Sequence, residues 1–108
     1  MIDLSNLIRS AVDCGASDIH LTVGKPPVFR LHGALVEQGE ALLEPEDTRQ
    51  AAGELASREQ MDVLEQMGEV DFATTYQEIV RMRCNVFFQR GCMALELRLL
   101  PMRIPSAE

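Results

Sequence analysis

Two alternating segments joined by a short turn constrain this chain more than any other feature. Every second residue is apolar in VRMRCNVFFQ (residues 80–89), and the same holds in CMALELRLL (92–100). Such alternation is typical of strands that bury one face. Arg90-Gly91 between them favours a tight turn, which predicts an antiparallel hairpin. With a two-residue loop, Gln89 lies opposite Cys92, and apolar residues face apolar residues along one side of the hairpin.

The same register predicts an unusual pair on the opposite side of the hairpin. It places Asn85 opposite Glu96 and Arg83 opposite Arg98. Two facing arginines repel each other, at a cost of a few tenths to ~1 kcal/mol. Together, however, their guanidinium groups suit the oxygens of a phosphate. The spacing alone leaves a simpler alternative open, in which both arginines extend into solvent or pair with Glu96 and the acids of the middle segment.

The N-terminal part of the chain predicts one helix followed by short strands. Apolar residues recur at helical spacing over about residues 3–13, and Gly15 is a plausible end of that helix. Strands are expected at DIHLTV (18–23), VFRLHG (28–33) and ALVEQ (34–38), with a turn between the last two.

The middle of the chain predicts two helices and one more strand. Pro45 suits the first turn of a helix, and Ser57 with Gln60 fits a capping box that begins the next helix. That second helix is expected to bury a stripe made of Met61, Leu64 and Met67. VDFATTY (70–76) reads as a strand. This order of elements predicts an α+β fold with a mainly antiparallel sheet, an N-terminal helix and two middle helices.

Composition and charge narrow the classes of function. The 108 residues suffice for one domain, and 46% of them are hydrophobic. The formal net charge is -7, which makes the chain a poor general binder of nucleic acid. No apolar run approaches the ~20 residues of a membrane span, and three cysteines without CxxC spacing suit a reducing compartment. We therefore expect a cytoplasmic protein with no nucleic-acid partner.

Motifs for catalysis and metal binding are missing from the sequence. Gly24-Lys25 resembles part of a phosphate-binding loop, but Ile19 stands where that motif needs glycine and Pro26 where it needs Ser or Thr. No catalytic residue, metal ligand or ATPase activity is therefore expected of this chain.

Four further residues form a second candidate polar site. They are Asp18, His20, Asn85 and Gln89. Asp18 and His20 share a strand face and could serve as an acid/base pair, but such residues more often order a turn or bond to the backbone, which is the interpretation that we favour.

Three stretches together resemble a known family. They are ASDIHLTVGKPPVFRLHG (16–33), VDFA (70–73) and MRCNVFFQRGCMALELRLLPMRIPS (82–106). In this order they are similar to the N-terminal domain of PilT-like members of the secretion-ATPase superfamily. The resemblance implies a PAS-like domain over residues 1–103, and the start of a linker to a RecA-like ATPase core over residues 104–108.

The resemblance also implies a function. Members of the family are hexameric ATPases at the cytoplasmic face of the inner membrane, where they power type IV pilus retraction (twitching motility) or related secretion. The full-length protein would use ATP and Mg²⁺, although this part of it would hold no cofactor. Its partners would be the RecA-like core of its own chain, further copies in a homo-hexamer, and an inner-membrane pilus or secretion platform. Arg83 and Arg98 match arginines that the family brings to the nucleotide phosphates.

A second hypothesis is a freestanding PAS-like module that binds a small ligand or a protein and has no catalytic activity. It would use the sheet face that carries Arg83, Asn85 and Phe87.

Overall fold

A computed structural model describes residues 2–101, so the expected linker over residues 104–108 lies outside the described residues. Within residues 2–101, three helices and six strands follow one another. They are α1 (Leu4–Cys14), β1 (Asp18–Leu21), β2 (Val28–Leu31), β3 (Ala34–Glu37), α2 (Pro45–Leu55), α3 (Arg58–Met67), β4 (Glu69–Tyr76), β5 (Val80–Gln89) and β6 (Cys92–Pro101). Within residues 2–101, no helix is long and apolar enough to cross a membrane.

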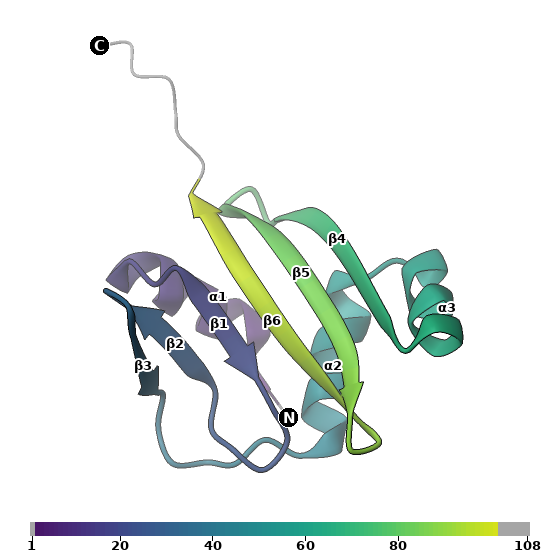
Figure 1. Cartoon of the computed structure of the whole chain (residues 1–108). Helices are drawn as coiled ribbons and strands as arrows, with labels where there is room; N and C mark the ends of the chain where they lie inside the picture. The colour runs from purple at the N-terminus through teal and green to yellow at the C-terminus, as the bar shows by residue number, and fades with distance from the viewer. Residues whose placement is uncertain (1, 102–108) are drawn as a thin grey trace, which may run out of the picture.

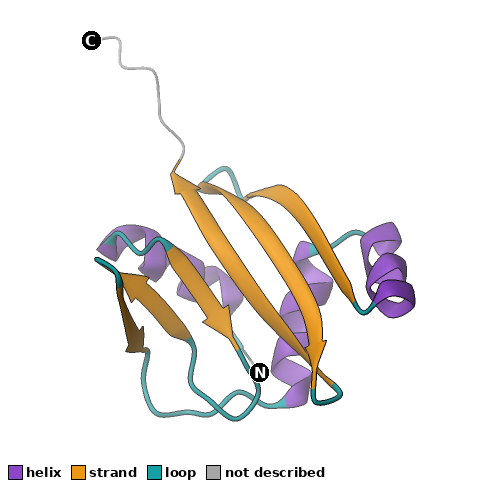
Figure 2. Cartoon of the chain, viewed as in Figure 1, coloured by secondary structure: helices purple, strands orange, loops and turns teal. Residues whose placement is uncertain are grey.

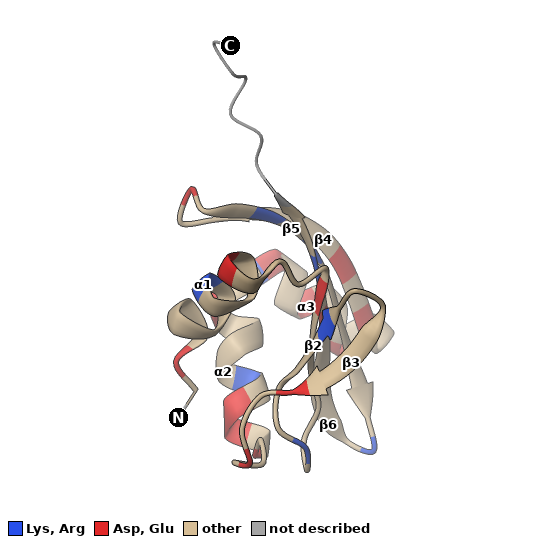
Figure 3. Ribbon diagram, turned by 90° about the vertical axis from the view of Figure 1, so that its left-hand side faces the viewer, with Lys and Arg blue, Asp and Glu red and all other residues tan. Residues whose placement is uncertain are grey.

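The six strands form one sheet in the order β3-β2-β1-β6-β5-β4, and every neighbouring pair is antiparallel. Helices α1 and α2 lie behind this sheet, and α3 lies beside β4 (Figures 1 and 2). Seen edge-on, the helices occupy one side of the sheet (Figure 3). The predicted α+β fold, with its N-terminal helix and two middle helices, is confirmed.

The hairpin of β5 and β6 has the predicted register. Gln89 pairs with Cys92, and Arg83 pairs with Arg98. Arg90 and Gly91 have φ angles of 55° and 80°, as a type I′ turn requires at both central positions. This turn matches the right-handed twist of the strands, so it fixes which residues face one another along the whole hairpin.

The core lies between the sheet and the helices. Alternate residues of β5 and β6 are buried there, among them Cys84 and Leu97, which are both 0% exposed. Their neighbour on β1 is Ile19, also 0% exposed. The capping box of α3 is confirmed as well. The backbone N–H of Gln60 donates to Ser57 Oγ (3.2 Å), and the backbone N–H of Ser57 donates to Gln60 Oε1 (2.8 Å).

Two local predictions are wrong, for Met67 and for the end of β1, and Phe88 is more exposed than the rest of the inward face of β5. Met67 is 74% exposed, because it is the last residue of α3, and Leu64 at 0% exposure buries that helix instead. Phe88 is 41% exposed, because it is the last inward position of β5 before the turn. Strand β1 ends at Leu21 instead of residue 23, since the chain then turns, with the Lys25 amide donating to the Thr22 carbonyl (3.2 Å).

Candidate functional site

The outer face of the sheet, opposite the core, carries a row of charged side chains. Residues that pair directly across antiparallel strands point to the same face. Arg30 on β2 pairs with Asp18 on β1, Asp18 pairs with Arg98 on β6, and Arg98 pairs with Arg83 on β5. Three guanidinium groups and one carboxylate therefore cross four neighbouring strands in a straight line. We call these four residues the arginine row.

Asp18 is the only acid in the arginine row, and it contacts both arginines beside it. Its Oδ2 lies 3.6 Å from Arg98 Nε, and its Oδ1 lies 3.7 Å from Arg30 Nε. The Ser17 hydroxyl donates a hydrogen bond of 2.6 Å to Oδ1. The expectation that Asp18 orders a turn or bonds to the backbone is therefore wrong. Its carboxylate contacts arginine side chains.

Arg83 has no such partner. Its guanidinium group makes no hydrogen bond or ion pair with another residue in the range 2–101. Arg98, although it contacts Asp18, keeps 68% of its side chain exposed. The two arginines that the sequence singled out thus lie side by side on an open surface, one of them loosely paired and the other free to meet an anion.

A second row of outer-face residues lies two residues from the arginine row along each strand and carries two acids. It consists of His20, Glu96, Asn85 and Asp71, which pair in that order across β1, β6, β5 and β4. His20 Nδ1 lies 3.9 Å from Glu96 Oε2, while His20 Nε2 has no hydrogen-bond partner among the described residues. Asn85 Nδ2 donates to the Val70 carbonyl (3.4 Å). His20 and Asn85 of the second candidate polar site therefore lie beside the arginine row, while their role stays a prediction.

A shallow hollow of about 140 Å³ lies between the two rows. It is lined by Asp18, Asp71, Arg83, Asn85, Glu96 and Arg98. Three carboxylates thus surround two guanidinium groups, and the residues that line the hollow carry a net charge of −1. A phosphate that approached the arginines would also meet these carboxylates. The isolated surface is therefore a poor anion site, and a second surface would have to bring the phosphate to it.

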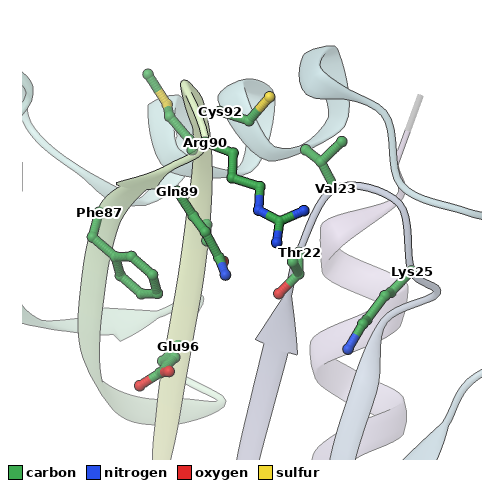
Figure 4. Close-up of a pocket in the computed structure, with 10 residues that line it drawn as sticks. Thr22, Val23, Lys25, Phe87, Gln89, Arg90, Cys92 and Glu96 are labelled. Carbon is green, nitrogen blue, oxygen red and sulfur yellow. The ribbon is translucent and has the colours of Figure 1, made fainter.

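Gln89 belongs to a different hollow, of about 640 Å³, at the end of the sheet. This hollow opens where the loop after β1 diverges from β6, and the Arg90 side chain extends across it toward Thr22 (Figure 4). Lys25 lies on the opposite wall. The sequence did not indicate that Lys25 and Arg90 share a site, because each flanks a separate turn and no local pattern links them.

Among residues 2–101, no group of three or more His, Cys, Asp or Glu side chains is arranged to hold a metal ion.

The fold changes the proton affinity of the buried Cys84 thiol. Burial raises the pKa of its thiol to about 12, and the Asp71 carboxylate adds to the increase. Since the thiolate is the reactive form, we expect a thiol reagent at pH 8 to modify Cys14 and Cys92 but not Cys84. Mass spectrometry before and after unfolding in urea measures this, and rapid modification of all three thiols in buffer would contradict it.

The raised pKa of Cys84 also makes the free energy of unfolding depend on pH. The folded protein keeps this thiol protonated at pH values where the unfolded chain ionises it. The stabilisation is complete below the ordinary thiol pKa of 9.0 and is lost as the pH rises toward about 12.

Comparisons of the sequence and of the fold with known proteins identify similar ATPases. No family model matches the chain. The type IV pilus ATPase PilU of Pseudomonas aeruginosa is 29% identical over 107 residues, which cover 99% of this chain and 28% of PilU. A crystal structure of the pilus retraction motor PilT with bound ADP superposes with a TM-score of 0.88 at 36% identity, over 97% of this chain and 31% of that one. The chain is a homologue of the N-terminal domain of PilT-like secretion ATPases.

The fold also occurs in a solved structure with lower sequence identity. The ATPase DotB of Legionella pneumophila superposes with a TM-score of 0.77 at 19% identity, over 94% of this chain and 29% of DotB. The chain spans about a third of the length of the curated relatives that it matches. The resemblance noted in the sequence is confirmed, while the roles of Arg83 and Arg98 within it stay a prediction.

Proposed function

We propose that this chain is the PAS-like regulatory and assembly domain of a hexameric PilT-like ATPase. That ATPase would power type IV pilus retraction or related secretion, and Arg83 and Arg98 would contact the phosphates of ATP bound on the ATPase core. The observation that carries the proposal is the direct pairing of Arg83 with Arg98 on an open sheet face. The likeness to PilT and PilU supports the same function.

The balance of charge explains why the core must present the nucleotide. The hollow at the arginines is acidic by one charge, so it attracts free phosphate poorly. ATP held by the core would meet these arginines at close range, where charge-assisted hydrogen bonds to phosphate are strong and often bidentate. ATP and Mg²⁺ would bind to the core, because this chain has no phosphate-binding loop.

The remaining parts of the proposal concern assembly and location. The domain would contact its own RecA-like core and further copies in a homo-hexamer. The complete ATPase would be cytoplasmic and would reach the inner membrane through a pilus or secretion platform. It would make no contact with nucleic acid.

The reading frame that encodes this chain tests the proposal. We expect it to continue past Glu108 into a GxxxxGK[ST] segment within a few tens of residues. The longer product should hydrolyse ATP, and the 108-residue chain alone should not, which a phosphate-release assay measures. A stop codon close after Glu108, or equal turnover by the two proteins, would contradict the proposal.

A second candidate function is a freestanding ligand-binding module, and the hollow of about 640 Å³ favours it. Lys25 and Arg90 would suit an anionic ligand there. A saturable ligand or a defined dimer of the isolated chain would support this module. A ligand-poor monomer would favour the ATPase domain instead.

A further inference from the structure

Asp18 occupies a position from which it competes with any anion for Arg98. Its Oδ2 lies 3.6 Å from Arg98 Nε, and the two residues pair directly across β1 and β6. Asp18 is mostly buried, with 18% of its side chain exposed, whereas Arg98 is 68% exposed. The carboxylate is therefore fixed in place, while the guanidinium group is free to turn away from it.

The contact between them is weak enough to be exchanged. A separation of 3.6 Å is longer than a hydrogen bond, so charge attraction alone holds the pair. Because the arginine of this pair is largely exposed, water screens the attraction, and the pair contributes little to stability. A phosphate offers more negative charge and several acceptor oxygens, and it would draw Arg98 away from Asp18 if the two came within reach.

Asp18 would not be left without a partner after such an exchange. Its two oxygens have separate contacts, and Oδ2 is the one that faces Arg98. Oδ1 accepts the hydrogen bond from Ser17 and lies 3.7 Å from Arg30 Nε. Losing Arg98 therefore exposes one carboxylate oxygen to water while the other keeps its contacts. The cost of releasing Arg98 is small for this reason.

We propose that Asp18 is the resting counter-ion of Arg98 and competes with the phosphates of ATP for it. Arg98 pairs with Asp18 when no nucleotide is near and moves to the phosphate when the core presents one. Arg30 then holds Asp18 in place. Asp18 is thus a positioning residue that acts through Arg98 and lowers the affinity of the ATPase for ATP. This inference rests on the proposed phosphate contact of Arg98.

Steady-state kinetics of the longer protein, which joins this chain to an ATPase core, tests the competition. Asp18→Asn keeps the size of the side chain and its ability to accept from Ser17, but it removes the charge that attracts Arg98. We expect KM for ATP to fall about threefold, as the loss of a competing exposed ion pair predicts, with kcat little changed. An unchanged or raised KM would overturn the inference.

Two further variants separate a specific pair from a general effect of charge. Asp71→Asn removes one negative charge from the same hollow without touching an arginine contact, so it should lower KM by less than Asp18→Asn does. In an Arg98→Ala background, Asp18→Asn should lower KM by no more than Asp71→Asn does, because the arginine for which Asp18 competes is gone. An equal decrease in both backgrounds, or equal effects of the two asparagine variants, would overturn the inference.

The side chains themselves give a test that needs no ATP. In the 108-residue chain, the ¹⁵N–¹H signals of Arg98 Nε and Arg30 Nε should both shift in Asp18→Asn, while that of Arg83 should shift little. Unshifted Arg98 and Arg30 signals would overturn the resting pair. If instead these signals shift and Arg98→Ala leaves turnover and KM of the longer protein at wild-type values, the phosphate contact has failed, and the competition with ATP fails with it.

Discussion

Arg83→Ala and Arg98→Ala are each expected to lower kcat/KM for ATP in the longer protein by about 10- to 150-fold. The estimate follows from the loss of one charge-assisted hydrogen bond, about 1.5–3 kcal/mol, between a guanidinium group and phosphate. The loss should be greater for Arg83. Arg83 has no partner among residues 2–101. Arg98 must give up its contact with Asp18 to bind phosphate, so its net contribution is smaller.

Arg81→Ala is the matched control for both variants. Arg81 lies on β5 two residues before Arg83, on the same outer face as both arginines, and its guanidinium group donates to Thr75 Oγ1 (3.3 Å). The same charge is lost at nearly the same place, so a general effect of charge would reduce the activity of all three variants alike. Urea unfolding should give similar midpoints for the three, because each side chain is exposed. Turnover of Arg83→Ala and Arg98→Ala at the wild-type rate would refute the proposed contact.

The sequence alone sufficed to predict the hairpin down to its register. A two-residue turn and strict alternation leave one arrangement in which every inward pair is apolar, so local information fixes the pairing of Arg83 with Arg98. Helix boundaries at Gly15 and Ser57 were predictable for the same reason. Each is marked by a residue whose conformation or hydrogen bond ends or begins a helix locally.

The rest of the site depends on contacts between distant parts of the chain. Asp18 meets Arg98 because β1 pairs with β6, and Arg30 joins the row through β2. No local pattern states which strands become neighbours when 80 positions separate Asp18 from Arg98. The sequence therefore named Asp18 as a candidate polar residue without placing it beside Arg98, and it did not indicate Arg30. The same limit hid the shared hollow of Lys25 and Arg90.

Exposure at the ends of elements was unpredictable for a related reason. Periodicity states which face a residue occupies, as it did for Met67 and Phe88, but not where the neighbouring layer stops. Both residues lie at the last position of their face, and both are exposed. They lie together at one hollow beside Gly68, next to the site but outside the arginine row.

Leu97→Ala is expected to lower the free energy of unfolding of this chain by about 2–5 kcal/mol. Leu97 is 0% exposed and lies between Ile19 on β1 and Cys84 on β5, at the centre of the sheet. Three hydrogen-bonded strands hold these neighbours apart, so the cavity left by the leucine cannot close. The loss is a large share of the ~5–15 kcal/mol that stabilises a domain of this size.

Leu100→Ala supplies the control on the same strand, because Leu100 is 39% exposed on the outer face and its truncation should cost less than ~1 kcal/mol. Urea unfolding followed by circular dichroism measures the stability of both variants. Equal midpoints would show that Leu97 does not stabilise the core more than Leu100 stabilises the surface. Since Leu97 precedes Arg98 and pairs with the strand residue next to Arg83, the same burial that stabilises the sheet also holds the arginine row in register. A partly unfolded Leu97→Ala protein should therefore lose the ¹⁵N–¹H signals of the Arg98–Asp18 pair before it loses its helices.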